Sequence, residues 1–158
     1  MEKLEQMGDE QFIFGALLIG ANRMDTLLER ALKEFDITSK QWMLSIVIDN
    51  LFGEAPTIKE AAREMGSSHQ NVKQLALKLE QKGLLRLEKD KCDARVTRLK
   101  MPPESAAFWN KTQPKGTAFM DAVFGGITKE ELAAARGVLN KIAANLADME
   151  NRNIERSK

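Results

Sequence analysis

The sequence is poor in the residue types that build catalytic and metal sites. Its 158 residues include one cysteine, Cys92, and one histidine, His69. A single cysteine excludes an internal disulfide and a cysteine-rich zinc site, and a single histidine excludes a metal cluster of histidines within one chain. The ten glycines are scattered and form no phosphate-binding loop. We therefore predict that the chain is not an enzyme and needs no cofactor and no metal.

Long apolar runs are also missing. The longest stretch without a charged residue is 11–22, twelve residues, whereas a membrane-spanning helix needs about 20 apolar residues. The first five residues are acidic and polar, unlike a signal peptide. With 43% hydrophobic and 30% charged residues, the composition is that of a globular protein. These features predict a soluble, cytoplasmic chain that does not associate with membranes.

The net charge of +1 hides an uneven distribution of charge along the chain. Residues 1–56 carry 5 Lys+Arg against 10 Asp+Glu, residues 57–100 carry 11 against 6, and residues 101–158 carry 8 against 7. The middle block therefore has an excess of five positive charges, 11 minus 6. This excess indicates one surface for a polyanion, and the alternative is chance clustering of solvated lysines.

Hydrophobic spacing predicts helices on the N-terminal side of the basic block. Apolar residues recur at helical spacing over 9–35. The first half of this segment, 12–19, is apolar on nearly every face, which predicts burial on all sides, including against a second chain. Thr38 followed by Gln41 is a capping box, in which each side chain satisfies a free backbone N–H group of the helix start. We expect a second helix to begin there.

The basic block has the pattern of a winged helix. A capping box at Thr57 opens a short helix that Gly66 ends, and Ser67 and Ser68 offer the N-cap of the next helix. Two helices at this separation are typical of a helix-turn-helix. Alternating residues at 85–88 and 97–101 then flank a charged loop, which predicts a β-hairpin that projects as a wing. The inward stripe of the second helix is predicted as Val72, Leu75, Ala76 and Leu79.

The C-terminal third is predicted to be helical again. Pro102 and Pro103 break the chain, and helix resumes around 104, with Pro114 and Gly116 expected to kink or interrupt it. A third capping box at Thr128 opens a final helix whose apolar residues follow a heptad seam. This seam packs either on its own domain or against a second chain, and the over-apolar first helix favours a second chain.

Five motifs, in this order along the chain, resemble those of the MarR family of winged-helix transcription regulators. They lie at 38–42, 57–62, 79–85, 93–95 and 124–132. The resemblance covers nearly the whole chain, although the family's usual exit from the wing is replaced by Met-Pro-Pro-Glu-Ser. It implies a mainly α fold with a small β-hairpin wing: a winged helix-turn-helix plus a helical dimerisation body.

The same resemblance implies the organisation of the chain and its partners. A single MarR-like domain would span 1–158, with dimerisation helices at 9–35 and 104–152 and the DNA-binding winged helix-turn-helix at 37–101. The protein would be a homodimeric, sequence-specific DNA-binding transcription regulator, acting as a repressor that a small ligand releases. Two-fold symmetry predicts a pseudo-palindromic double-stranded operator with half-sites about one helical turn apart.

Side-chain chemistry suggests which residues contact DNA. Gln and Asn can pair with adenine edges, and Lys with guanine acceptors or phosphates. A flexible cation at a hairpin tip, here Arg95, can enter a narrow A·T-rich minor groove. Asp93 is expected to hold the wing turn or to orient a neighbouring arginine. The expected DNA-contacting residues are Ser68, His69, Gln70, Asn71, Lys73, Gln74, Lys78, Lys89, Lys91, Arg95 and Arg98.

Regulators of this family commonly bind small, often aromatic ligands between the dimer body and the winged helix. The resemblance places a ligand site at Phe12, Phe35, Trp42 and Met43, and the alternative is that these are core residues. Cys92 raises redox sensing as another alternative, although sensing cysteines of relatives lie near the first helix. The rival function is a winged-helix dimer that binds protein, RNA or DNA of any sequence and responds to no ligand.

Overall fold

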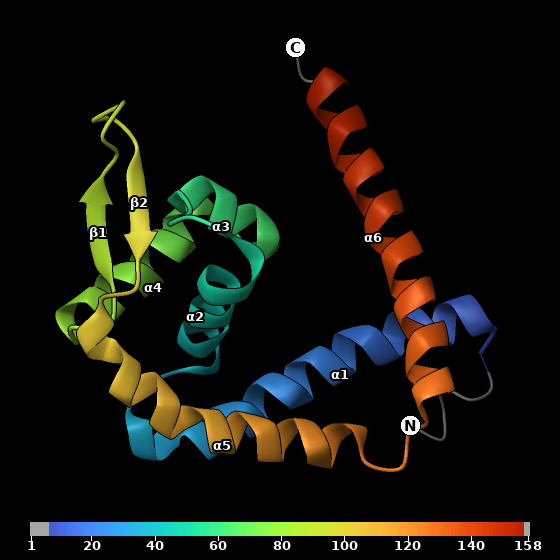
Figure 1. Cartoon of the computed structure of the whole chain (residues 1–158). Helices are drawn as coiled ribbons and strands as arrows, with labels where there is room; N and C mark the ends of the chain where they lie inside the picture. Colours follow the sequence, from blue (N-terminus) through green and yellow to red (C-terminus); the bar gives the residue numbers. More distant parts are fainter. Residues whose placement is uncertain (1–6, 157–158) are drawn as a thin grey trace. The chain divides into compact units, whose positions relative to one another are not determined.

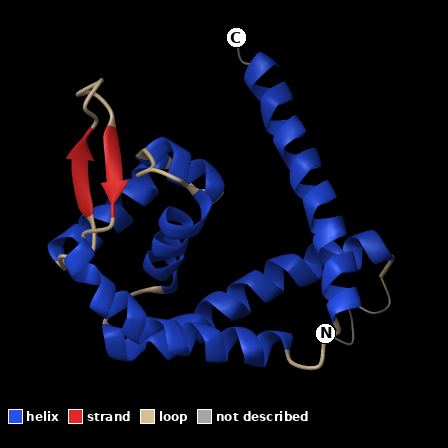
Figure 2. Ribbon diagram, in the orientation of Figure 1, coloured by secondary structure: helices blue, strands red, loops and turns tan. Residues whose placement is uncertain are grey.

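The computed structural model describes residues 7–156 (Figure 1). Within this range it contains six α-helices, two short 3-10 helices and one two-stranded antiparallel sheet. Figure 2 shows the single hairpin among the helices. The chain divides into two compact units, one ending at Phe119 and one beginning at Met120, and each is described by itself. No helix of the described residues is both long enough and apolar enough to span a membrane.

The first unit begins with two helices joined by a tight turn. Helix α1 spans Asp9–Leu32 and continues into the 3-10 turn η1, Lys33–Phe35, and helix α2 spans Ser39–Leu51. The predicted capping box is present at the start of α2, because Thr38 Oγ1 accepts from the Gln41 N–H at 3.2 Å and Gln41 Oε1 accepts from the Thr38 N–H at 3.0 Å. Local sequence therefore sets where α2 begins.

The predicted winged helix-turn-helix follows. Helix α3 spans Ile58–Glu64 and helix α4 spans His69–Gln81. Gly66 lies between them at φ +56°, a left-handed conformation that glycine adopts without strain. Strands β1, Arg86–Lys89, and β2, Thr97–Lys100, pair antiparallel with Leu87 opposite Leu99. The hairpin stands beside α3 and α4 in Figure 1.

One hydrophobic core holds these elements together. Helix α4 contributes Val72, Ala76 and Leu79, which are buried as the predicted stripe requires, and Leu75 is partly buried against them. Strand β2 contributes Leu99, which is fully buried. The other buried apolar side chains are Leu32, Ile37, Leu44, Val47, Ile48, Ile58, Ala61, Ala62, Leu84 and Leu85. Each element of the winged helix is therefore fixed by burial of its apolar face.

Pro114 and Gly116 were predicted to kink or interrupt the helix, and the structure shows that they do not interrupt it. A 3-10 turn, η2, Pro103–Ser105, leads directly into helix α5, Ala106–Phe124, which continues through both residues. Proline removes one backbone donor and crowds the preceding turn, yet the backbone is helical on both sides of Pro114. A Cβ at Gly116 would lie 2.4 Å from the Trp42 ring. Glycine is required there because α5 and α2 approach each other closely.

The second unit contains the last turn of α5 and helix α6, Lys129–Arg156. The third predicted capping box is present: Thr128 Oγ1 accepts from the Glu131 N–H at 3.2 Å, and a Glu131 carboxylate oxygen accepts from the Thr128 N–H at 2.8 Å. Large apolar side chains of this unit are exposed: Met120, Phe124, Ile127, Leu132, Val138, Leu139, Leu146 and Met149. Helix α1, in the first unit, also exposes Ile13, Phe14, Leu17, Leu18, Ile19, Met24 and Leu27.

Candidate nucleic-acid interface

The outward face of α4 carries polar side chains at every position where the sequence predicts DNA contacts. Ser68 is the N-cap of this helix, and its Oγ accepts from the Asn71 N–H at 3.1 Å. The Asn71 amide in turn donates to Ser67 Oγ at 2.9 Å, so part of its hydrogen-bonding capacity is used within the turn. The predicted residues of this face that are exposed are Ser68, His69, Gln70, Asn71, Lys73, Gln74 and Lys78.

The wing loop is organised by Asp90, a residue that the sequence pattern does not single out. Its Oδ1 accepts from the N–H groups of Cys92 and Asp93 at 2.9 and 3.0 Å, and its Oδ2 forms an ion pair with Arg98. The hydrogen bond from Arg98, followed by those from the two backbone N–H groups, lowers the Asp90 pKa from 3.8 to about 2. Asp90 thus stays ionised and closes the loop.

Two expectations for the wing have different outcomes. Asp93 holds the turn, because its Oδ1 accepts from the Arg95 N–H at 2.9 Å, but the carboxylate that orients an arginine is that of Asp90. Arg98, expected to contact DNA, is half-buried and also donates to the Ala55 carbonyl at 2.8 Å. Arg98 therefore stabilises the wing, because its guanidinium connects Asp90 in the wing loop to the loop before α3.

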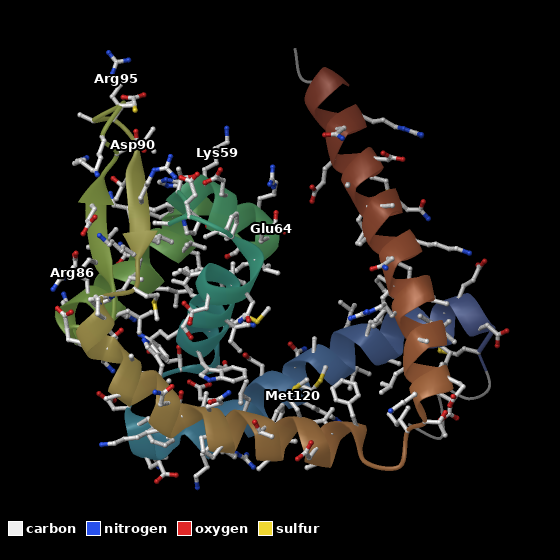
Figure 3. All side chains as sticks on the ribbon, in the orientation of Figure 1. Lys59, Glu64, Arg86, Asp90, Arg95 and Met120 are labelled. Atoms are coloured by element: carbon white, nitrogen blue, oxygen red, sulfur yellow. The ribbon has the colours of Figure 1, made fainter. Side chains whose placement is uncertain are left out.

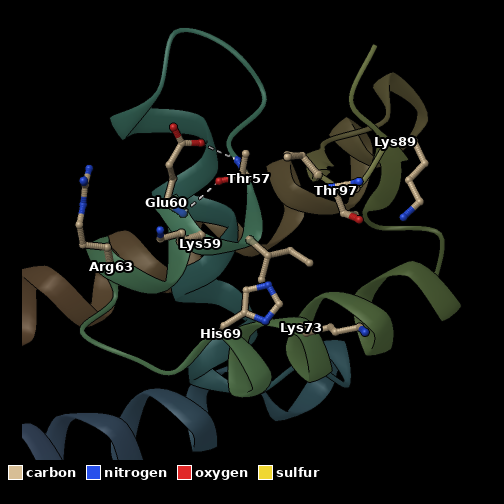
Figure 4. Close-up of a pocket in the computed structure, with 11 residues that line it drawn as sticks. Thr57, Lys59, Glu60, Arg63, His69, Lys73, Lys89 and Thr97 are labelled. Carbon is tan, nitrogen blue, oxygen red and sulfur yellow. Dashed lines mark hydrogen bonds between the residues drawn. The ribbon is translucent and has the colours of Figure 1, made fainter. Parts of the chain in front are cut away.

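A groove of about 840 Å³ lies between α3, the start of α4 and the wing (Figure 4). The only carboxylate in its lining is Glu60, which accepts from the Thr57 N–H at 2.7 Å, and this hydrogen bond lowers the Glu60 pKa. In Figure 3, Arg95 lies at the wing tip and Lys59 extends from α3. The basic side chains of the lining are Lys59, Arg63, His69, Lys73, Lys89 and Arg95.

Lys59 and Arg63 were not among the residues predicted to bind DNA. They are exposed on α3, whereas Ile58, Ala61 and Ala62 of the same helix are buried. The signal for them was available in the sequence. A helix that buries its apolar stripe presents the intervening positions to solvent, and both of these positions carry a positive charge.

Ion pairing separates the cations of the basic block into two groups. Lys82, Arg86, Arg98 and Lys100 pair with carboxylates of Asp36, Glu104, Asp90 and Glu88, and Arg63 pairs with its neighbour Glu64. The cations that form no ion pair with any described residue are Lys59, Lys73, Lys78, Lys89, Lys91 and Arg95. Four of these six line the groove. The groove therefore concentrates positive charge that the rest of the described chain does not neutralise.

The four residues predicted to bind a ligand do not share a pocket. Phe12 lies in the first turn of α1, which at about 1.5 Å per residue is roughly 30 Å from the end of that helix. Phe35 and Trp42 pack against the core, Phe35 edge-on against Phe108 at 6.2 Å, and Met43 is exposed. The resemblance gives the general region of a ligand site, and it does not show which of these side chains converge within one chain.

A slot of about 340 Å³ between α2 and α5 is lined by Trp42 and Trp109, the two tryptophans of the chain. The Trp109 Nε1 is buried and has no acceptor within residues 7–156. Asp49 also lines the slot, and burial raises the pKa of its carboxyl group. The lining of the slot thus includes two tryptophans, one of which carries a hydrogen-bond donor without an acceptor in the described chain.

Comparison with known proteins assigns this architecture. Residues 35–96, which contain the helix-turn-helix and most of the wing, match the MarR family. The structure of transcriptional regulator PA3341 matches at a TM-score of 0.74 and 25% identity, over 85% of this chain and 98% of that chain. The helix-turn-helix and most of the wing therefore match the MarR family, and the chain resembles MarR-family structures over most of its length. Its fold is that of the winged-helix transcription regulators of this family.

Two further solved structures show the same fold. Bordetella bronchiseptica BpsR, solved to explain regulation of its DNA binding by 6-hydroxynicotinic acid, matches at a TM-score of 0.69 and 19% identity over 82% of this chain and 91% of that chain. Staphylococcus aureus MepR, solved in complex with DNA, matches at a TM-score of 0.74 and 17% identity over 89% of this chain and 99% of that chain.

Proposed function

We propose that this MarR-family regulator is a homodimeric repressor that places the outward face of α4 in the major groove and the wing in the adjacent minor groove. The observation that carries this proposal is the groove between α3, α4 and the wing, whose lining includes four cations without an ion-pair partner in the described chain. Cations that are not neutralised within the protein are available to replace the counterions of DNA phosphates.

Two surfaces support the homodimer. Helix α1 exposes a run of large apolar side chains, with Phe14 66% exposed, and the second unit exposes another set along α6. Contiguous apolar surface of this kind is characteristic of protein–protein interfaces. A dimer with two winged helices would cover a pseudo-palindromic site, and its presence on the DNA would block access by polymerase.

Ligand response is the second part of the proposal, and the slot between Trp42 and Trp109 supports it. A planar ring carrying a hydrogen-bond acceptor would stack in the slot and satisfy the Trp109 Nε1 donor. 6-Hydroxynicotinic acid for BpsR and 2,4-dichlorophenol for the regulator RdhR are small aromatic molecules of this size class. A ligand would release DNA by binding more tightly to a dimer whose winged helices are poorly placed for the operator.

The test is fluorescence-anisotropy binding to DNA from the chain's own upstream region at several salt concentrations, beside an unrelated duplex. We expect tighter binding to the upstream duplex, weakened by salt and by Arg95→Ala. Lys111→Ala is the matched control, because Lys111 is exposed on α5 and forms no ion pair with described residues. Equal affinity for both duplexes would refute sequence-specific regulation and support the nonspecific alternative.

A further inference from the structure

A second groove, of about 530 Å³, lies at the C-terminal end of α4. The end of α1, η1 and the start of α2 form its other walls. Its two carboxylates are Glu29 and Asp36, and Asp36 is paired with Lys82 at 2.9 Å. Its four cations are Arg30, Lys33, Lys78 and Lys82. The groove therefore has an excess of two positive charges, four cations less two carboxylates.

Gln41 adds a hydrogen-bond donor to this groove. The residue is only 3% exposed, and its Oε1 is occupied by the Thr38 N–H. The Gln41 Nε2 donates to no acceptor among the described residues, although the side chain lines the groove. Within the described residues, Trp109 Nε1 is the buried side-chain atom that lacks a partner, so Gln41 Nε2 keeps contact with solvent and is free to donate into the groove. An oxygen atom of a bound group in the groove would satisfy it.

The two grooves lie at opposite ends of α4. His69 and Lys73 line the first, and Lys78 and Lys82 line the second. His69 and Lys78 are nine residues apart, which corresponds to about 14 Å along a helix axis. The major groove of B-DNA is about 12 Å wide between its two phosphate backbones. A helix seated in the major groove would thus have one cationic groove near each backbone.

We propose that the groove between the end of α1, the start of α2 and the end of α4 binds a phosphate group. Arg30 and Lys33 supply charge, and the Gln41 amide donates a hydrogen bond. The placement favours a phosphate of the operator backbone, on the opposite side of the major groove from the wing contacts, and this assignment rests on the proposed function. A free phosphorylated metabolite presents the same chemistry, and the experiment separates the two sources.

The first arm measures DNA affinity against salt concentration for Lys33→Gln and for Arg30→Gln combined with Lys33→Gln. Both side chains are exposed, so the fold should be retained. If the operator backbone is the ligand, the slope of log affinity against log salt falls by about 0.9 for each phosphate that the variant no longer neutralises. A dimer carries each substitution twice, so one lost contact per chain lowers the slope by about 1.8. The decrease should be equal for operator and unrelated duplex, since phosphates carry no sequence information. Lys111→Gln should leave the slope unchanged.

The second arm uses inorganic phosphate and no DNA, and follows the side-chain amide resonances of Gln41 by NMR. A saturable shift that Lys33→Gln weakens, together with an unchanged DNA slope, would identify a free phosphate compound as the ligand. An unchanged slope and unmoved Gln41 resonances would overturn the proposal. Failure of the wild-type chain to bind its operator would refute the proposed function, and the phosphate titration would still decide the second groove.

Discussion

The winged helix and the outer helices expose opposite kinds of surface. The winged helix buries its apolar side chains in one core and exposes Lys59, Lys73 and Arg95 without ion-pair partners in the described chain. Helix α1 buries only Leu32 and exposes large apolar side chains. Helix α6 exposes large apolar side chains along its length. Exposed charge attracts a polyanion, whereas exposed apolar surface favours another protein chain. The contrast therefore supports the proposal that the winged helix binds DNA and that the outer helices assemble the dimer.

The largest expected effect comes from placing a charge on the apolar surface of α1. In Phe14→Glu, a residue that is 66% exposed in the single chain acquires a carboxylate. If a second chain covers this surface, dimerisation buries two unpaired carboxylates, one from each chain, at a combined cost of roughly 3 kcal/mol, which raises the dimer dissociation constant ~100-fold. Sedimentation equilibrium measures it. Asn110→Glu, at an exposed polar position of α5, is the control. An unchanged dissociation constant would remove α1 from the interface.

The next comparison uses two helical glycines. A Cβ at Gly116 would lie 2.4 Å from the Trp42 ring, whereas a Cβ at Gly137 in α6 meets no described atom within 4 Å. Gly116→Ala should lower the free energy of unfolding by about 1–3 kcal/mol because it overpacks the α2–α5 contact. Gly137→Ala should raise it by about 0.5–1 kcal/mol through helix propensity. Urea denaturation measures both. Destabilisation by Gly137→Ala would mean that a second chain packs closely at that position.

Within the winged helix, paired and unpaired lysines should differ in their effect on DNA binding. Lys59 lines the cationic groove and forms no ion pair with described residues, whereas Lys100 Nζ lies 3.4 Å from a Glu88 carboxylate oxygen. Lys59→Gln should lower the salt slope of DNA affinity by about 0.9 for each phosphate that Lys59 neutralises. Lys100→Gln should change the slope little. Equal slopes for the two variants would show that pairing within the chain does not decide which cations reach DNA.

The sequence predicted what local chemistry determines. The capping boxes at Thr38, Thr57 and Thr128 are present because each depends on residues three positions apart. Contacts between distant residues were missed. Gly116 and Trp42 are far apart in sequence, so Gly116 was interpreted as a residue that kinks or interrupts the helix, and its close contact with the Trp42 ring inside a continuous helix was missed.

In the wing as well, the sequence did not predict a contact between residues that are separated along the chain. The sequence pattern identified Asp93 as a turn residue, and the structure agrees. It did not identify Asp90, whose carboxylate reaches Arg98 only once the loop closes and the two strands pair in register. Arg98 was grouped with the DNA contacts because its charge is visible in the sequence and its partner is not. A cation that is paired within the chain, as Arg98 is with Asp90, is therefore less available to a DNA phosphate than an unpaired one.

The smallest expected effect tests that pairing through pH. Hydrogen bonds from Arg98 and from the N–H groups of Cys92 and Asp93 lower the Asp90 pKa to about 2 in the folded chain, below the unfolded value of 3.8. A lowered folded pKa contributes stability that is fully present above the unfolded value and is lost as pH falls from about 4 towards 2. Asp90→Asn should therefore be less stable than the wild type at pH 7, and the difference should shrink across that interval. Urea denaturation from pH 7 to pH 2.5 measures it, with Glu88→Gln in the same hairpin as control. A difference that stayed constant with pH would show that Asp90 acts through its shape and not through its charge.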